Sequence, residues 1–125
     1  MNIFIYLIVV APSAPLPLQA FKAEFFKALA HPLRIRILEL LVGGERSVLE
    51  LQRALAVEQP VVSQQLAVLR AKHIVHARKE GTTVRYAVRD PEIGALLEAA
   101  RRIFNNQLIG TRTMLRELAR ERRRR

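Results

Sequence analysis

The spacing of apolar residues predicts two helices in the first third of the chain. Residues 18–30 carry apolar side chains four positions apart, on one face of a helix: Phe21, Phe25 and Leu29. His31 ends this helix, because the residue before a proline disfavours the helical region, and we interpret it as structural. Pro32 opens a second helix, since a proline in the first turn has no N–H to leave unpaired, and Gly43-Gly44 ends it.

Two further helices follow, separated by a short turn. Ser47 and Glu50 form a capping box, in which each side chain pairs with the other residue's backbone N–H. The turn "AVEQP" leads into a helix at residues 59–71, with the apolar stripe Val62, Leu66 and Leu69. Helix, short turn and helix form a helix-turn-helix.

After Lys72 the spacing of apolar residues changes from about 3.6 positions, which is typical of a helix, to two positions, which is typical of a strand. Val84, Tyr86 and Val88 alternate with Thr83, Arg85 and Arg89, and Gly81 lies at the predicted tip, so residues 74–88 form a β-hairpin. Asp90 and Pro91 then begin a long apolar-striped helix, which we expect Gly110 to bend or break. The fold class is mainly α with a small β-hairpin wing.

Four segments in this order resemble the ArsR/SmtB family of bacterial dimeric transcriptional repressors. They are "FKALAHPLRIRILELL", "SVLELQRAL", "VVSQQLAVLRAKHIV" and "RKEGTTVRYAV", and the resemblance covers residues 21–104. It implies a winged helix-turn-helix that pairs through its first and last helices.

The helix at residues 59–71 carries uncharged polar residues where a solvated helix usually carries Glu and Lys. Gln offers both a donor and an acceptor to base edges, and Ser pairs with either kind. The resemblance places the base-facing positions at Gln59, Pro60, Ser63 and Gln64, whereas Gln65 lies nearer the core and is expected to be structural. The wing is expected to contact the DNA backbone or minor groove through Arg78, Lys79, Thr82, Thr83 and Arg85. A solvated helix face and a basic surface hairpin are the alternatives.

The first and last predicted helices carry more apolar surface than one small core needs. The expected homodimer interface consists of Phe25, Phe26, Ile93, Leu97, Ala100 and Phe104, although some of these side chains could instead fill the core of one chain. Such a dimer would bind double-stranded DNA at an inverted-repeat operator.

The family's metal ligands are missing from the corresponding positions. Ser47 and Leu49 stand where metal sensors of the family have cysteines, and Asp90, Glu92, Ile103 and Asn106 occupy a second family site that usually contains histidine. His31, His73 and His76 do not converge on either site. We therefore expect no metal and no cofactor, and no small-molecule effector is identifiable.

Composition supports a polyanionic partner. Twenty-one Lys and Arg against eleven Asp and Glu give the 125-residue chain a net charge of +10. No cysteine is present, which excludes disulfides and thiolate sites. No catalytic grouping of side chains is evident, so an enzyme is not expected. The prediction is a cytoplasmic, nucleoid-associated, sequence-specific repressor. A non-specific nucleoid-coating protein and a winged-helix adaptor for proteins or membranes are the alternatives.

The amino-terminal residues 1–18 are apolar and then proline-rich, and they are set apart from the DNA-binding domain at 19–110 and the Arg-rich tail at 111–125. Their apolar run is shorter than the roughly twenty residues needed to span a bilayer, and a membrane partner is not expected. Three interpretations stay open: a translation start nearer Gln19, a genuine apolar arm, and a secretion signal.

Overall fold

The computed structural model describes residues 16–124, which divide into one unit that ends at Pro91 and a second that begins at Glu92. Of the amino-terminal segment predicted at residues 1–18, residues 1–15 lie outside the described part, as does Arg125 of the predicted tail. The first unit contains helices α2 to α5 and three strands: α2 (Pro17–Leu29), α3 (Pro32–Val42), β1 (Arg46–Ser47), α4 (Val48–Leu55), α5 (Gln59–Ala71), β2 (Val75–Glu80) and β3 (Thr83–Val88). The second unit is the single helix α6 (Glu92–Arg124).

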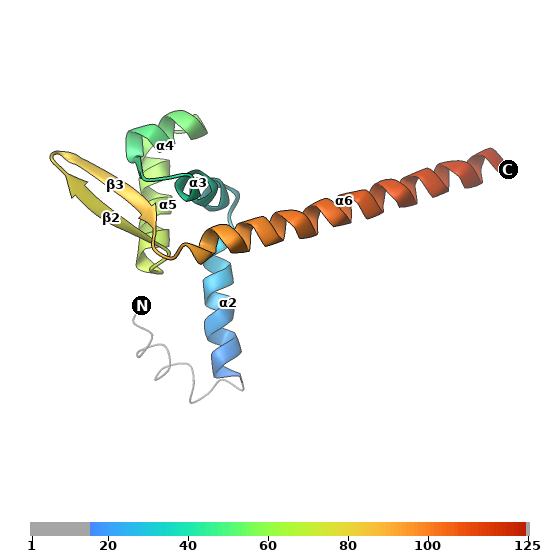
Figure 1. Cartoon of the computed structure of the whole chain (residues 1–125), viewed down its shortest axis with the longest axis horizontal. Coiled ribbons are helices and arrows are strands. Elements are labelled where there is room, and N and C mark those ends of the chain that lie inside the picture. The colour runs from blue at the N-terminus through green and yellow to red at the C-terminus, as the bar shows by residue number, and fades with distance from the viewer. Residues whose placement is uncertain (1–15, 125) are drawn as a thin grey trace. The chain divides into compact units, whose positions relative to one another are not determined.

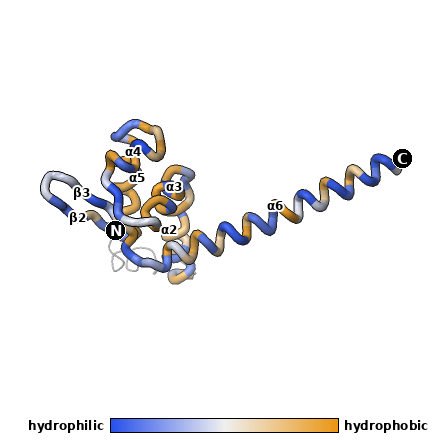
Figure 2. Tube along the Cα trace, turned by 45° about the horizontal axis from the view of Figure 1, so that its top comes forward, coloured by the Kyte–Doolittle hydropathy of each residue, from blue (hydrophilic) through white to orange (hydrophobic). Residues whose placement is uncertain are grey.

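The core of the first unit lies where α3, α4 and α5 meet, and hydrophobic stretches of these helices gather there in Figure 2. The predicted stripe of Val62, Leu66 and Leu69 is confirmed, with exposed fractions of 1% or less. The other large side chains that are almost completely buried come from α3, α4 and β2: Ile37, Leu38, Leu41, Leu51 and Val75. One face of α5 is therefore packed in the core, and the opposite face is exposed.

The strands form a three-stranded antiparallel sheet in the order β1-β3-β2. The predicted hairpin is confirmed: Glu80 pairs with Thr83, and Gly81 has a φ of 61°, a conformation that glycine adopts at little cost. Figure 1 shows β2 and β3 extending as a wing away from the helices of this unit. Strand β1 was not predicted, because a strand of two residues is too short to show the alternation of apolar and polar side chains.

Hydrogen bonds between residues close in sequence cap the amino-terminal ends of helices α3 and α4. The Leu33 N–H donates to His31 Nδ1 at 3.1 Å, so His31 caps α3 and has the structural role predicted for it. The predicted capping box is also confirmed: the Glu50 N–H donates to Ser47 Oγ at 3.2 Å, and the Ser47 N–H donates to Glu50 Oε1 at 3.3 Å. These bonds fix where α3 and α4 begin, and so the entry into the helix-turn-helix.

Helix α6 runs through Gly110 to Arg124, so the expectation that Gly110 breaks the helix was wrong. One glycine costs only about 1 kcal/mol relative to alanine in a helix interior, and the good helix formers around it outweigh that cost. The boundary predicted at residue 110 thus falls inside a helix. None of the helices within residues 16–124 combines the length and the apolar character needed to cross a bilayer.

Candidate nucleic-acid interface

The exposed face of α5 presents the uncharged polar residues predicted to read bases. Gln59, Pro60 and Gln64 are exposed and Ser63 is half-buried. Gln59 Nε2 donates to Ser63 Oγ at 3.3 Å, so one turn of the helix already orders two of these side chains. Pro60 lies in the first turn, where its missing N–H leaves no helical hydrogen bond unmade.

Gln65 points away from this face and has a structural contact, as predicted. Its Oε1 accepts a hydrogen bond of 3.0 Å from Arg34 Nη1, and Arg34 Nε donates to the Ala28 carbonyl at 2.7 Å. Arg34 thereby connects α5 with the end of α2. The glutamines at 64 and 65 are adjacent in sequence, but the structure gives them different surroundings.

Two wing arginines are already paired with carboxylates. Arg78 donates to both carboxylate oxygens of Glu45, each at 3.1 Å, and also to Glu80 at 3.3 Å. Arg85 lies 3.4 Å from Glu50 and 3.7 Å from Glu80. The hydrogen bonds from Arg78 hold the pKa of the Glu45 carboxyl below its ordinary value of 4.5. A phosphate would therefore compete with carboxylates for both guanidinium groups.

The predicted wing residues lie on two different faces of the hairpin. In the register of β2 and β3, Arg78 lies opposite Arg85 and Glu80 lies opposite Thr83, so these four side chains project from one face of the hairpin. Lys79 lies opposite Val84, and both project from the other face, which also carries Tyr86. Lys79, Thr82 and Thr83 are exposed. The structure therefore groups Arg78, Thr83 and Arg85 together, but it separates them from Lys79.

Neutralising Glu45 should remove the carboxylate that accepts two hydrogen bonds from Arg78, so that a phosphate competes for Arg78 with Glu80 alone. We expect Glu45→Gln to raise affinity for operator and random DNA alike, by roughly two- to fivefold, since exposed ion pairs are individually weak. Acidification should act in the same direction: the pKa of Glu45 is lowered by its pairing, so the ion pair is present above that pKa and is lost as the pH falls through it. The measurement is a fluorescence-anisotropy titration with labelled duplexes. Glu39→Gln removes the same charge from an exposed pair with Arg36 on α3, and an equal gain there would exclude a specific role for Glu45.

A groove of about 450 Å³ lies between α5 and β3, beside the polar face of α5. It is lined by Ser63, Leu66, Ala67, Arg70, Ala71 and Tyr86. Arg70 and Tyr86 were not predicted as site residues. The position of Arg70, seven residues or about two helical turns after Ser63, is a signal in the sequence that would have placed it on the same side of the helix.

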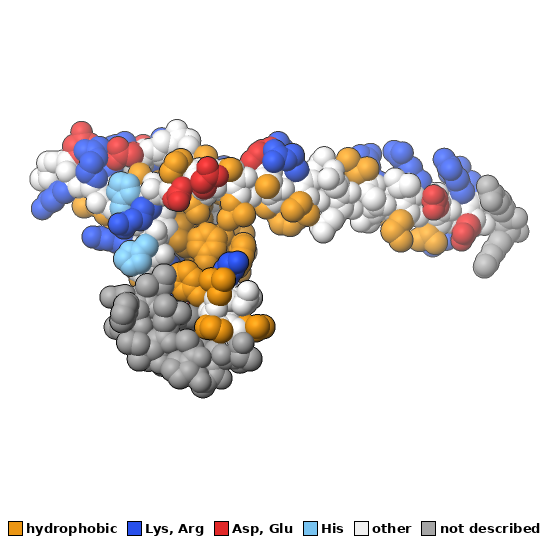
Figure 3. All heavy atoms as spheres, turned by 60° about the horizontal axis from the view of Figure 1, so that its bottom comes forward, with side chains coloured by type: hydrophobic (Ala, Val, Ile, Leu, Met, Phe, Trp, Pro, Cys, Tyr) orange, Lys and Arg blue, Asp and Glu red, His pale blue; other side chains and the backbone are white. Residues whose placement is uncertain are grey.

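The residues predicted for a dimer interface differ in exposure. Phe26 is 55% exposed and Phe104 is 59% exposed, while Phe25, Leu97 and Ala100 are half-buried and Ile93 is buried. Phe25 and Phe26 stack edge to face, with ring centroids 5.4 Å apart. In Figure 3 apolar side chains are visible along α6 between clusters of Lys and Arg. The exposed large apolar residues of α6 are Ile103, Phe104, Leu108, Ile109, Met114, Leu115 and Leu118.

The part of the chain that the structure describes contains no group of three or more His, Cys, Asp or Glu side chains that could hold a metal ion. Of the four positions of the second family metal site, Ile103 has no ligand atom and lies exposed on α6.

Comparison with known proteins gives consistent matches. The family described as a helix-turn-helix domain matches residues 29–76. An uncharacterized HTH-type transcriptional regulator of Mycobacterium tuberculosis, Rv0081, is 47% identical over 103 residues, which cover 82% of this chain and 90% of the relative. A biofilm growth-associated repressor of Agrobacterium fabrum is 39% identical over 94 residues, which cover 72% of this chain and 80% of the relative.

The comparison with solved structures gives matches to proteins of the same kind. The crystal structure of Rv0081 covers 79% of this chain and 98% of its own, with a TM-score of 0.72 at 47% identity. A homodimeric winged helix-turn-helix DNA-binding domain from Mycobacterium bovis, described as a possible ArsR-family regulator, has a TM-score of 0.68 at 29% identity and covers 77% of this chain and 89% of its own.

Proposed function

Because the chain belongs to the ArsR/SmtB family of winged helix-turn-helix transcriptional regulators, we propose that it is a homodimeric repressor of an inverted-repeat operator. The observation that carries this proposal is the exposed, uncharged polar face of α5 at Gln59, Ser63 and Gln64. We further propose that it acts in the cytoplasm, at the nucleoid.

The chemistry of this face suits base reading better than phosphate binding. The major groove admits one helix, and each base pair presents there a distinct pattern of donors and acceptors. A glutamine amide matches the donor and acceptor of adenine, whereas a cationic side chain would bind any phosphate. Gln64 is exposed and has no hydrogen bond among those found in residues 16–124, so its amide is available to a base. Pro60 has no donor and offers an apolar contact to a thymine methyl.

Dimerisation follows from the limited reach of one recognition helix. Two copies related by a two-fold axis read half-sites about one helical turn apart, and an operator with inverted symmetry matches them. The exposed apolar residues of α2 and α6 supply surface for such pairing, and the M. bovis domain is homodimeric. We therefore assign the partner contacts to Phe25, Phe26, Leu97, Ala100 and Phe104, with Ile93 contributing least because it is buried.

Removing the Gln64 amide should weaken specific binding. We expect Gln64→Ala to cost about 1–3 kcal/mol on the operator and to leave affinity for random DNA nearly unchanged. The measurement is a pair of titrations at one salt concentration, on the operator and on a scrambled duplex.

Gln65→Ala is the matched control, since it removes an identical side chain that contacts Arg34. It should lower the thermal midpoint while preserving the preference for the operator. If Gln64→Ala weakened both duplexes equally, Gln64 would not be a base-reading residue.

Selection of ligands from a random duplex library at about 150 mM salt tests the proposed function directly, since this salt suppresses much of the non-specific binding. The full chain should enrich an inverted repeat with half-sites about one helical turn apart. Failure to bind any duplex would refute the proposal.

A non-specific coating protein is the second candidate, favoured by the seven arginines between residues 112 and 125. Helix α6 carries those among residues 112–124. This candidate predicts tight binding without enrichment of any sequence, and a steep fall of affinity with salt.

A further inference from the structure

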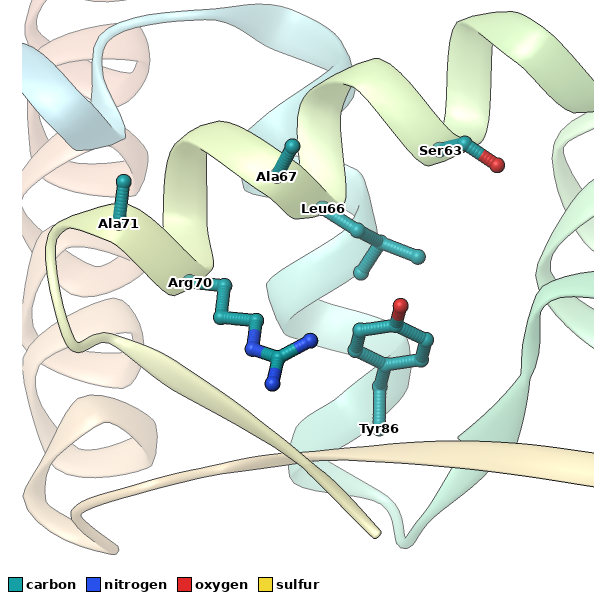
Figure 4. A pocket seen from close by; sticks show the side chains of 6 residues that line it. All are labelled: Ser63, Leu66, Ala67, Arg70, Ala71 and Tyr86. Carbon is teal, nitrogen blue, oxygen red and sulfur yellow. The ribbon is translucent and has the colours of Figure 1, made fainter. Parts of the chain in front are cut away.

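The groove between α5 and β3 combines an apolar floor with polar groups at its rim. Leu66, Ala67 and Ala71 of α5 line it with apolar side chains, and of these Leu66 is 1% exposed. Figure 4 shows the guanidinium of Arg70 and the phenol hydroxyl of Tyr86 reaching into the same space beneath α5, with the Ser63 hydroxyl further along the helix. Its volume of about 450 Å³ is in the range of clefts that hold small ligands.

Arg70 differs from the arginines of the wing. Arg78 and Arg85 are paired with Glu45, Glu50 and Glu80, whereas no carboxylate lies within salt-bridge distance of Arg70 among the described residues. Glu24, the carboxylate that pairs near the end of α5, pairs with Lys72 at 3.8 Å. The groove thus contains a cation without a counter-ion, which favours an anionic ligand.

The groove opens beside the face of α5 that we propose reads bases. Ser63 and Arg70 lie seven residues apart, so they project from the same side of the helix, and Ser63 belongs to both the groove and the base-reading set. The lining of the groove on α5 runs from Ser63, one helical turn beyond Gln59, to Ala71, so a ligand in it would lie beside the DNA that Gln59 and Gln64 are proposed to contact. The sugar-phosphate backbone borders the major groove that admits one helix, so it is the part of the duplex that we assign to this place.

We propose that this groove receives one backbone phosphate of the operator together with its deoxyribose. Arg70 donates to the phosphate oxygens, the Tyr86 and Ser63 hydroxyls donate to the same group, and Ala67 and Ala71 contact the sugar. The contact sets the register of α5 in the major groove, because phosphate contacts fix orientation while base contacts provide discrimination. This inference rests on the proposed function and adds a phosphate site to it.

The first test is removal of the guanidinium. Arg70→Gln should weaken operator and random DNA by about tenfold each, since a hydrogen bond to a charged group is worth about that factor. It should also reduce the dependence of log affinity on log salt by about one unit per chain. Tyr86→Phe should weaken both duplexes less and leave the salt dependence unchanged. Arg36→Gln removes the same charge from α3 and should change the salt dependence much less.

The second test alters the DNA and leaves the protein intact. Each operator phosphate is replaced in turn by an uncharged methylphosphonate. For the wild-type chain, one position in each half-site should reduce affinity about tenfold, and for Arg70→Gln the same position should have no further effect. If the two scans were identical, Arg70 would not contact a phosphate and the inference would be refuted.

The same phosphate chemistry could come from a free phosphorylated metabolite, and deoxyribose 5-phosphate is the probe for that source. The inference expects millimolar probe neither to bind the free protein nor to displace DNA. Displacement of DNA by the probe, without a methylphosphonate position that depends on Arg70, would identify an effector site and overturn the inference. A wild-type chain that binds no duplex at all would instead refute the proposed function.

Discussion

Replacing Phe104 by Glu should convert the protein to a monomer and abolish tight operator binding. Phe104 is 59% exposed on α6, in a stripe of residues three or four positions apart: Leu97, Ala100, Phe104, Leu108, Thr111, Leu115 and Leu118. This spacing places them on one side of a helix, the pattern of a helix that packs against a partner. A carboxylate in the middle of that contact would lose its hydration without gaining a cation, and the two-fold axis would introduce it in both copies.

The expected size of this effect is large because two losses add. Pairing of the two chains becomes unfavourable, and a single half-site then has to hold one chain alone. We expect operator affinity to fall by at least about 100-fold, or about 2.7 kcal/mol, at protein concentrations near the wild-type dissociation constant. Sedimentation equilibrium gives the oligomeric state, and an anisotropy titration on the selected operator gives the affinity.

Ile109→Glu is the matched control on the same helix. Ile109 is 54% exposed and is also a large apolar residue, but five residues further along α6 correspond to about 140° of rotation away from Phe104. This variant should remain dimeric and bind the operator as the wild type does. A dimeric Phe104→Glu variant, or loss of the dimer in both variants, would contradict the assignment of this stripe to the interface.

Features encoded by neighbouring residues could be predicted from the sequence. The capping box at Ser47 and Glu50, the tip at Gly81 and the stripe at Val62, Leu66 and Leu69 each depend on residues only a few positions apart. Their physics is local: a cap pairs exposed N–H groups, glycine tolerates a positive φ, and a helix repeats every 3.6 residues. These signals were sufficient to predict the winged helix-turn-helix.

Features formed by residues distant in sequence could not be predicted. Glu45 and Arg78 are 33 residues apart, so no local pattern shows that a predicted phosphate contact is already paired with a carboxylate. Arg34 and Gln65 are 31 residues apart, and only the packing of α5 against α3 brings them together. The groove at Arg70 and Tyr86 lies between a helix and a strand, and these two residues are 16 positions apart in the sequence. The sequence thus indicated the type of site, whereas the electrostatics of the wing required the structure.

Leu51→Ala should be among the most destabilising single substitutions in the chain. Of the eight residues of α4, only Leu51 is buried, with an exposed fraction of 0%, and α4 contacts α3, α5 and the strands β1 and β3. Truncation of a fully buried leucine to alanine costs about 2–5 kcal/mol, because the lost apolar transfer energy adds to the cost of the cavity. That is a large part of the roughly 5–15 kcal/mol by which small domains are stable.

Loss of this anchor should also affect function, because α4 fixes the start of α5 through the turn at residues 56–58. The measurement is urea unfolding followed by circular dichroism, at one protein concentration for all variants since dimer stability depends on it. Leu49→Ala is the matched control: the same change in the same helix, at a side chain that is 53% exposed, should alter the free energy of unfolding by less than about 0.5 kcal/mol. Equal destabilisation by the two substitutions would mean that Leu51 does not anchor α4 to the core.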